Sequence, residues 1–371
     1  MGRKQVWKTL WLDLQDVHLW KPQGMIPYYM YKEYNMKAGV VAYPNEDYPS
    51  AEKIEGIDVE CICPKYGETI DSCLYMLRNA RKIDYLYTYH IKWKALMPIL
   101  VFRILNPRGR VWLDLDWNLN WAESYNALKE GNAWERVQFW MQKFIMQRCC
   151  TLITSSASAC CRRFSEIYGI KNSVKYVPCG FEMIECEHSD KENIILMVGR
   201  LGTGQKNAEL LVNAFCNTYN IQNWKLVMIG TAEKKFLRFL ENKKAQIDIE
   251  NRICYMGQIA DRKELAQWYA RSKVFVLPSR WESFGIVLCE AIAQGCYLVA
   301  SDKIVSWKDI TNNSIENGKS FKNNNVKDLS RTLIEVIASP YLEKEYAEKR
   351  KQYARKFLYA EIVKDVYKYL K

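Results

Sequence analysis

The alternation of apolar and polar residues is clearest in the last third of the chain. An apolar run from Val274 to Leu277 predicts a strand, and a second run from Cys296 to Ala300 predicts another. A loop, Pro278 to Trp281, and a segment with helical period lie between them; the helix is expected to begin at Glu282 and to end before Gly295. This order of strand, helix and strand predicts a βαβ unit of a parallel sheet.

The same pattern recurs along most of the chain. Helical segments separate the runs, among them an aromatic-rich helix from Trp134 to Gln147, expected in the core, and a helix from Asp261 to Ala270. Alternating strands and helices predict an α/β fold of doubly wound parallel sheets with helices on both faces. The remaining predicted strands are Lys8–Leu14, Val40–Ala42, Val59–Cys63, Asp84–His90, Val111–Asp116, Cys150–Ser155, Val174–Val177, Ile194–Arg200, Lys225–Gly230 and Ile253–Met256.

The length of 371 residues suits two domains, each large enough to bury a substantial interior. With 49% apolar and 26% charged residues the chain has the composition of an ordinary globular protein. The charged run Glu185–Asn193 is the expected linker. We therefore expect domains at 1–185 and 186–345, followed by a final segment at 346–371.

The formal charge of +12 favours an anionic partner, such as a membrane surface, a nucleotide, an acidic glycan or a nucleic acid. A generally basic solvated surface is the alternative. Eight basic residues and one acid between Arg78 and Arg110 bracket an apolar helix that contains Trp93. This segment suits an anionic membrane surface, and a buried helix with solvated ends is the alternative. No basic and aromatic module is recognisable, so a nucleic acid is not expected.

The 13 cysteines form no C-x-x-C spacing, and the sequence shows no signal-peptide pattern. Reduced thiols in the cytoplasm are therefore expected, and a zinc site is not. No run approaches the roughly 18 uncharged apolar residues of a spanning helix. The chain is expected to be cytoplasmic, and the basic segment allows peripheral binding to the cytoplasmic face of the inner membrane.

Candidate chemistry is concentrated in the second half. Ser283, Phe284 and Gly285 fall in the expected first turn of the helix that begins at Glu282, where unpaired backbone amides favour a phosphate. Glu290, further along this helix, is a carboxylate suited to the two hydroxyls of a ribose. Two cations, Arg200 and Lys206, flank a glycine-containing loop and could reach a diphosphate.

The run Glu282-Ser283-Phe284-Gly285-Ile286-Val287-Leu288-Cys289-Glu290-Ala291 resembles the signature of the family-4 retaining glycosyltransferases, the glycosyl transferases group 1, which have the GT-B fold. Gly199-Arg200 and Lys206-Asn207, separated by a five-residue loop, resemble a second motif of this family, and Asn317-Gly318 with Phe321 a third. The resemblance implies two Rossmann-like domains that face each other across a cleft, with the last helix crossing back onto the first domain.

The resemblance also implies an activity: transfer of a sugar, of hexosyl type, from a UDP-linked nucleotide-sugar to a hydroxyl of a glycan or lipid-linked acceptor, with retention, in bacterial surface polysaccharide synthesis. No metal and no cofactor besides the donor is expected. Arg200 and Lys206 would stabilise the leaving diphosphate, and Glu282 would orient the sugar. The expected donor contacts are Gly24, Gly199, Gly230, Gln258, Ile259, Ser283, Phe284, Gly285, Ile286, Val287 and Glu290.

Three residues of the first domain are further candidates. Gly24 follows the first strand, and either contacts the donor phosphates or is a turn glycine before a core helix. His90 ends a strand and either lines the cleft or is structural. Asp116 stands where the family commonly has a histidine, and is a candidate for a sugar hydroxyl or the acceptor.

Two rival interpretations remain open. Asp114-Leu115-Asp116 mimics the D-x-D motif of metal-dependent glycosyltransferases, and strand alternation puts both carboxylates on one face. A catalytically silent GT-B fold that binds a glycan or a partner protein is the second rival. It is favoured by Cys179, Asp116 and Cys296, which depart from the family pattern. The intact set of Arg200, Lys206, Glu282 and Glu290 argues against it.

Overall fold

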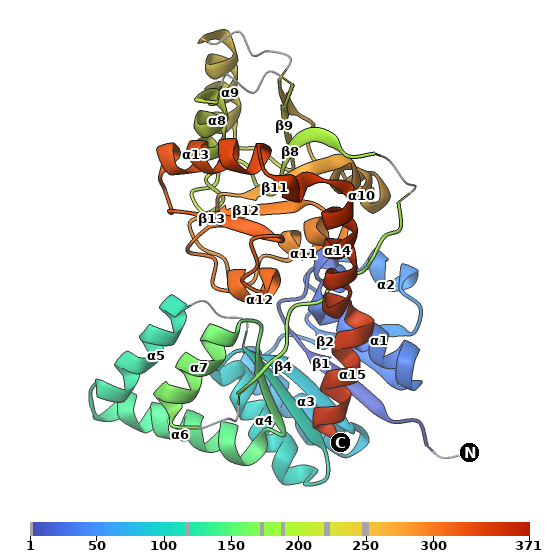
Figure 1. Cartoon of the computed structure of the whole chain (residues 1–371). Coiled ribbons are helices and arrows are strands. Elements are labelled where there is room, and N and C mark those ends of the chain that lie inside the picture. Colours follow the sequence, from blue (N-terminus) through green and yellow to red (C-terminus); the bar gives the residue numbers. More distant parts are fainter. Residues whose placement is uncertain (1–2, 116–118, 171–173, 187–189, 219–222, 247–251) are drawn as a thin grey trace. The chain divides into compact units, whose positions relative to one another are not determined.

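The chain divides into two compact units. A computed structural model describes residues 3–115, 119–170, 174–186, 190–218, 223–246 and 252–371. Unit 1 comprises Met1–Gly180 and Tyr359–Lys371, and unit 2 comprises Phe181–Leu358 (Figure 1). The sequence placed divisions after residues 185 and 345, whereas the chain changes unit at 180/181 and again at 358/359.

Unit 1 contains a parallel sheet of seven strands in the order β3-β2-β1-β4-β5-β6-β7. Each strand corresponds to an apolar run in the sequence, with ends that differ by a few residues from those predicted. The strands are β1 (Val6–Leu10), β2 (Lys37–Ala42), β3 (Ile57–Cys61), β4 (Tyr85–Tyr89), β5 (Arg110–Leu115), β6 (Leu152–Ser155) and β7 (Val174–Tyr176).

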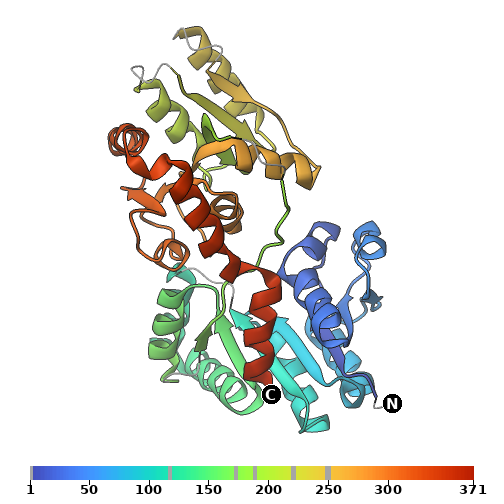
Figure 2. The ribbon, with the colours of Figure 1, turned by 45° about the vertical axis from the view of Figure 1, so that its right-hand side comes forward.

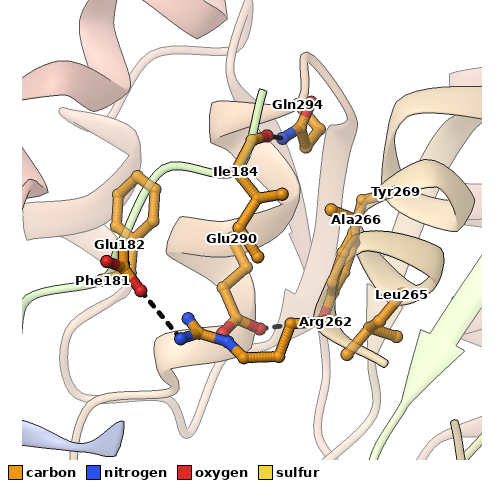
Figure 3. A pocket seen from close by; sticks show the side chains of 9 residues that line it. All are labelled: Phe181, Glu182, Ile184, Arg262, Leu265, Ala266, Tyr269, Glu290 and Gln294. Atoms are coloured by element: carbon orange, nitrogen blue, oxygen red, sulfur yellow. Dashed lines mark hydrogen bonds and ion pairs between the residues drawn. The ribbon is translucent and has the colours of Figure 1, made fainter. Parts of the chain in front are cut away.

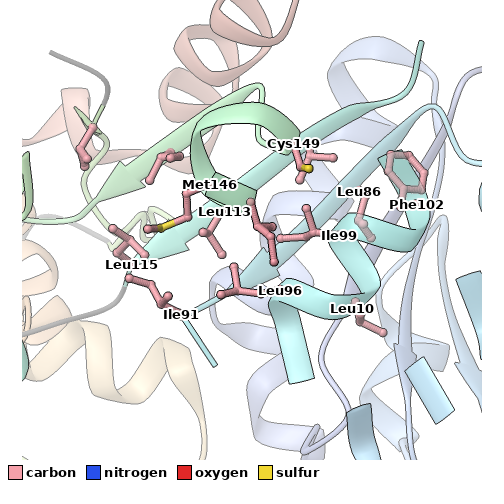
Figure 4. Close-up of a cluster of buried hydrophobic side chains, with 14 of the residues drawn as sticks. Leu10, Leu86, Ile91, Leu96, Ile99, Phe102, Leu113, Leu115, Met146 and Cys149 are labelled. Carbon is pink, nitrogen blue, oxygen red and sulfur yellow. The ribbon is translucent and has the colours of Figure 1, made fainter. Parts of the chain in front are cut away.

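Helices cover both faces of this sheet, as a doubly wound fold requires (Figure 2). On one face a core of aliphatic and aromatic residues lies under α3, α4, α6 and α7, and Figure 4 shows Met146 and Cys149 pointing into it beside Leu96 and Ile99. The helices of unit 1 are α1 (Pro22–Tyr34), α2 (Pro49–Lys53), α3 (Glu68–Asn79), α4 (Trp93–Leu105), α5 (Leu119–Glu130), α6 (Ala133–Cys149), α7 (Ser158–Tyr168) and α15 (Tyr359–Leu370).

On the opposite face, α15 packs beside α1 although more than 300 residues of chain separate them. Its Ile362, Val363 and Val366 are buried in one core with Trp7 and Tyr87 of the sheet. The last helix therefore completes unit 1. The preceding helix α14 (Lys344–Ala354) stays with unit 2 and packs on α11, so the final segment is divided between the units.

Unit 2 contains a second parallel sheet, of six strands in the order β10-β9-β8-β11-β12-β13. Its strands are β8 (Glu192–Val198), β9 (Lys225–Ile229), β10 (Ile253–Tyr255), β11 (Ser272–Leu277), β12 (Tyr297–Ser301) and β13 (Gly318–Phe321). Its other helices are α8 (Ala208–Cys216), α9 (Lys234–Gln246), α10 (Arg262–Arg271), α11 (Ile286–Ala293), α12 (Trp307–Thr311) and α13 (Val326–Ile337).

The strands of unit 2 are apolar on both faces because helices bury both. Val274 and Val276 of β11 point into the core that α8, α9 and α13 cover. Phe275, between them, faces the other way, and its ring lies 5.6 Å from that of Tyr269 on α10. This explains why β11 is a continuous apolar run and does not alternate.

The strand order of each sheet reverses direction at one place, between β1 and β4 in unit 1 and between β8 and β11 in unit 2. Ligands of open α/β sheets bind at the carboxyl ends of the strands beside such a reversal. The topology alone therefore points to the residues that follow β1, β4, β8 and β11.

The structure shows which sides of two predicted helices are buried. The apolar helix α4 buries Leu96, Ile99 and Phe102 in the core of unit 1, as the buried-helix alternative expects. Helix α6 is only half in the core, because Trp134 and Trp140 are exposed. The expectation of a core helix therefore holds for the side of α6 that carries Phe139, and was wrong for the side that carries Trp134 and Trp140. No helix within the described ranges is long and apolar enough to cross a membrane.

Candidate nucleotide-sugar site

The strongest cluster of candidate residues lies at the reversal of strand order in unit 2. Lys206, at the end of the loop after β8, and Glu282, in the loop after β11, form an ion pair of 2.6 Å between Nζ and Oε1. The same carboxylate oxygen accepts a hydrogen bond of 2.6 Å from the hydroxyl of Ser279. The two charged side chains are only 13% and 9% exposed. The structure thus brings together two residues that the sequence proposed separately.

The loop after β8 is fastened to the loop after β11 by further hydrogen bonds. The guanidinium of Arg200 donates to the side-chain oxygen of Gln205 (3.2 Å), and Gln205 donates to the carbonyl of Trp281 (3.1 Å). The backbone amide of Arg280 donates to the carbonyl of Gln205 (2.8 Å). Arg200 itself is exposed, so its guanidinium is held at the rim of the site by Gln205.

Glycines at the ends of β8 and β9 allow the backbones to approach closely. Gly230 has φ = 134°, and a Cβ there would lie 1.9 Å from the carbonyl oxygen of Gly199. No other residue fits, which explains Gly230 without a ligand. Beyond Gly257, which accepts a hydrogen bond from the Gly230 amide, Gln258 is exposed and Ile259 half-buried in the loop between β10 and α10.

Helix α11 begins at Ile286, four residues later than predicted. Gly285 has φ = 85°, which reverses the chain direction immediately before the helix, and the carbonyl of Phe284 is held by the Ser306 hydroxyl. Ser283 and Phe284 therefore lie in the loop and not in the first turn. The first amides of a helix have no intrahelical acceptor and can bind a phosphate. In this helix those amides belong to Ile286 and Val287.

Glu290, one turn along α11, lines a pocket of unit 2 (Figure 3). The hydroxyl of Tyr269 donates to its carboxylate (3.1 Å), and an ion pair of 2.8 Å joins Arg262 to Glu182 across the same pocket. Burial raises the pKa of Glu290, although the Tyr269 hydrogen bond and the charge of Arg262 act in the opposite direction. A carboxylate that loses hydration in this way is stabilised by hydrogen bonds from hydroxyl groups, and a ribose provides two of them.

Four of these pocket and loop residues were not proposed from the sequence. Arg262 and Tyr269 lie on the same side of α10, seven residues apart, and Glu182 comes from the segment that enters unit 2. Ser279 precedes Glu282 by three residues. The seven-residue spacing of Arg262 and Tyr269 was visible in the sequence. Only the packing of α10 against α11 shows that these two residues face Glu290.

In unit 1, His90 lies at the reversal between β1 and β4. It follows β4 with φ = 64°, its amide donates to the Asp114 carbonyl (2.9 Å), and its ring is 5.8 Å from that of Trp11 after β1. This position is consistent with either role predicted for it. Gly24 is the third residue of α1, where a Cβ would lie 2.2 Å from the carbonyl oxygen of Leu19. That close approach explains why position 24 is a glycine. A contact between Gly24 and the phosphates of the nucleotide-sugar stays a prediction.

The D-x-D alternative concerns Asp114 and Asp116. The carboxylate of Asp114 accepts hydrogen bonds from the hydroxyls of Thr154 (2.7 Å) and Tyr87 (3.2 Å), so it is part of a polar network within the sheet. Asp116 lies outside the described residues. Among those that are described, no group of three or more His, Cys, Asp and Glu side chains could hold a metal ion.

Comparison with known proteins agrees with this geometry. Residues 182–357, nearly the whole of unit 2, match the family model of the glycosyl transferases group 1. An uncharacterised glycosyltransferase of Methanocaldococcus jannaschii is 36% identical over 112 residues, 30% of this chain and 28% of that protein. The lipopolysaccharide core biosynthesis mannosyltransferase LpsB of Rhizobium meliloti is 30% identical over 118 residues, 31% of this chain and 33% of LpsB. The matched regions span about a third of these relatives' length.

The likeness to solved structures extends over the whole chain. Anabaena HepE in complex with UDP superposes with a TM-score of 0.72 at 16% identity, over 99% of each chain. Together with the two parallel sheets, this likeness defines the fold class as GT-B. Within that class, residues 182–357 match the glycosyl transferases group 1, and this match confirms the resemblance found in the sequence.

Proposed function

We propose that the chain is a retaining glycosyltransferase that moves a sugar from a UDP-linked donor to a hydroxyl of a glycan or lipid-linked acceptor, in bacterial surface polysaccharide synthesis. The observation that carries the proposal is the buried Lys206–Glu282 pair at the strand reversal of unit 2. The lipopolysaccharide role of LpsB and the UDP bound to HepE support the acceptor class and the donor base.

The proposed roles follow from the positions of the side chains. Lys206, with Arg200 at the rim, would stabilise the charge that develops on the leaving diphosphate, because cations placed in advance cost no reorganisation during the reaction. The amides of Ile286 and Val287 would bind the same diphosphate. Glu282 would orient the sugar hydroxyls, and Glu290 would accept hydrogen bonds from the ribose.

The reaction needs no separate protein base. The bond between the anomeric carbon and the diphosphate oxygen breaks, the acceptor oxygen bonds to that carbon on the same face, and the acceptor proton passes to the leaving phosphate oxygen. In this scheme the protein supplies position and positive charge. We propose that the leaving charge is stabilised by Lys206 and Arg200 and not by a metal ion.

Calorimetric binding of UDP, GDP and ADP tests this proposal, each with and without a chelator. We expect one nucleotide to bind regardless of the chelator and Glu290→Ala to weaken that binding. Glu264→Ala, on the exposed side of α10, is the matched control and should bind normally. Binding of none of the three would favour the silent fold, and chelator-sensitive binding would favour the metal-dependent alternative.

A further inference from the structure

Helix α6 of unit 1 is apolar on two opposite sides. One side lies in the core and consists of Phe139, Ile145, Met146 and Cys149, with the buried Gln142 among them accepting a hydrogen bond from the Tyr168 hydroxyl. The other side faces outward and consists of Trp134, Val137, Trp140, Met141 and Phe144. Both sets follow a spacing of three and four residues, which is the repeat of one face of a helix. We call the second set the outer face of α6.

The outer face is unusually exposed for its composition. Trp134, Trp140 and Phe144 are 67%, 62% and 57% exposed. A surface helix normally carries polar residues on this side, and each aromatic side chain offers roughly 150–250 Å² of surface that would gain from burial. Single exposed apolar residues are ordinary, whereas a contiguous patch on one helix marks an interaction surface.

The charges beside the outer face are positive. Arg136 and Arg148 are exposed, and the ammonium of Lys143 lies 5.1 Å from the ring centroid of Trp140. The only acid of α6 is Glu135, whose carboxylate accepts a hydrogen bond of 2.8 Å from the Asn132 amide and so caps the helix start. The helix therefore combines exposed tryptophans with basic residues at the border.

We propose that the outer face of α6 docks on an anionic lipid surface. The helix would lie parallel to the membrane, with Trp134, Trp140 and Phe144 inserted at the level of the headgroups and Arg136, Lys143 and Arg148 beside the lipid phosphates. This combination of aromatic residues and basic neighbours is that of helices at membrane interfaces. The inference depends on unit 1 alone and not on the proposed reaction.

Sedimentation with lipid vesicles tests the docking surface. The full chain is mixed with vesicles of phosphatidylcholine alone or with phosphatidylglycerol added, and the bound fraction is measured at low and at high salt. The test variant is Trp140→Glu with Phe144→Glu. Its matched control is Ile315→Glu with Ile334→Glu, which adds the same charge at two apolar positions of unit 2 that are each 49% exposed.

We expect the wild type and the control to bind the phosphatidylglycerol vesicles, less so at high salt, and the test variant to bind at least about tenfold more weakly. Because the substituted side chains are exposed, circular dichroism and the urea midpoint should stay unchanged. A wild type that remains in the supernatant, or a test variant that binds equally well, overturns the proposal. So does a wild-type dimer in light scattering that the test variant abolishes, since α6 would then join two copies of the chain.

Discussion

At the scale of single residues, the side chain of Lys206 has two roles that an experiment must separate. It neutralises Glu282, which is almost buried, and it is the cation proposed to face the leaving diphosphate. Removal of one partner of a buried ion pair leaves the other charge without compensation, and this costs stability independently of catalysis. A loss of activity therefore has to be compared with the fraction of folded protein.

We expect Lys206→Ala to lower turnover by about 2–4 kcal/mol of transition-state stabilisation, the range for one lost donor of this kind. Steady-state rates with the nucleotide-sugar that binds best, corrected for the folded fraction, measure the effect. Lys234→Ala, which removes an exposed lysine of α9, is the control and should leave the rate unchanged. Near-normal turnover in Lys206→Ala would refute its role.

The raised pKa of Glu290 gives a second prediction at this scale. Burial favours the protonated acid, so on acidification Glu290 takes up its proton at a higher pH than an ordinary glutamate does. A protonated carboxyl accepts fewer hydrogen bonds from ribose hydroxyls. We expect the affinity for the nucleotide-sugar to fall on acidification, beginning at a higher pH than the titration of an ordinary glutamate would cause.

Calorimetry with a UDP-sugar measures this dependence. A terminal phosphate ionises at about pH 6, as a phosphorylated side chain does, whereas the diphosphate of a UDP-sugar is esterified at both ends and lacks this ionisation. In Glu290→Gln the affinity should be lower at neutral pH and nearly independent of pH. An identical pH profile in wild type and variant would show that Glu290 does not contact the donor.

Sequence reasoning identified the residues whose chemistry is local. Lys206, Glu282 and Glu290 stand beside strand ends and a helix start, where a few neighbouring residues fix the environment. Arg262 and Glu182 could not be found in this way, because their ion pair joins positions 80 apart and depends on how the entering segment packs on α10.

At the scale of secondary-structure elements, Arg350 of α14 shows how one side chain stabilises several loops. Its guanidinium is buried and donates to the carbonyls of Gly295 (3.1 Å), Glu316 (2.8 Å) and Tyr341 (2.9 Å). Burial lowers its pKa to about 10, which leaves the side chain charged at neutral pH. Arg350 thereby joins the turn before β12 to the segment before β13 and to the short 3-10 helix Pro340–Leu342.

We expect Arg350→Met to destabilise unit 2 by about 3 kcal/mol or more, because a buried carbonyl that loses its donor costs about 1–3 kcal/mol. Urea unfolding measures the change. Lys349→Met, one residue earlier on the exposed side of α14, should shift the midpoint little. Equal midpoints for the two variants would mean that other donors or water satisfy the three carbonyls.

The elements were predicted well where their pattern has one meaning. The strands of both sheets could be predicted from continuous apolar runs, because such runs are typical of strands in a parallel sheet that is buried on both faces. The start of α11 was misplaced because Gly285 adopts a left-handed conformation. The residues before it, Trp281 to Phe284, give no sign of that conformation in the sequence. The two apolar sides of α6 have similar patterns in the sequence. The sequence therefore does not show which side is buried in the core.

At the scale of the whole molecule, unit 1 is built from two distant parts of the chain. The amide of Phe181 donates to the carbonyl of Phe357 (3.1 Å), so the segments that enter and leave unit 2 run side by side. Next to them a Cβ on Gly180 would lie 2.1 Å from the ring of Tyr359, and a larger residue would displace α15. The sequence predicted the return of the last helix only through the family resemblance.

We expect Ile362→Ala, in the buried side of α15, to destabilise unit 1 by about 2–5 kcal/mol, the usual cost of this truncation in a core. Hydrogen exchange of the β1 and β2 amides measures the loss, and exchange in β8 and β11 should not change. Lys368→Ala, exposed on the same helix, is the control. Increased exchange in unit 2 alone would contradict the assignment of α15 to unit 1.

The return of α15 has a consequence for how the protein is made. On a ribosome, α1 and the first sheet emerge early, but the helix that covers their apolar face follows only after all of unit 2. At 5–20 residues per second this delay is roughly 10 to 40 s. During that time the aromatic side of α1 and β4 is open to water and to chaperones, so unit 2, which is continuous in sequence, is able to reach its native state first.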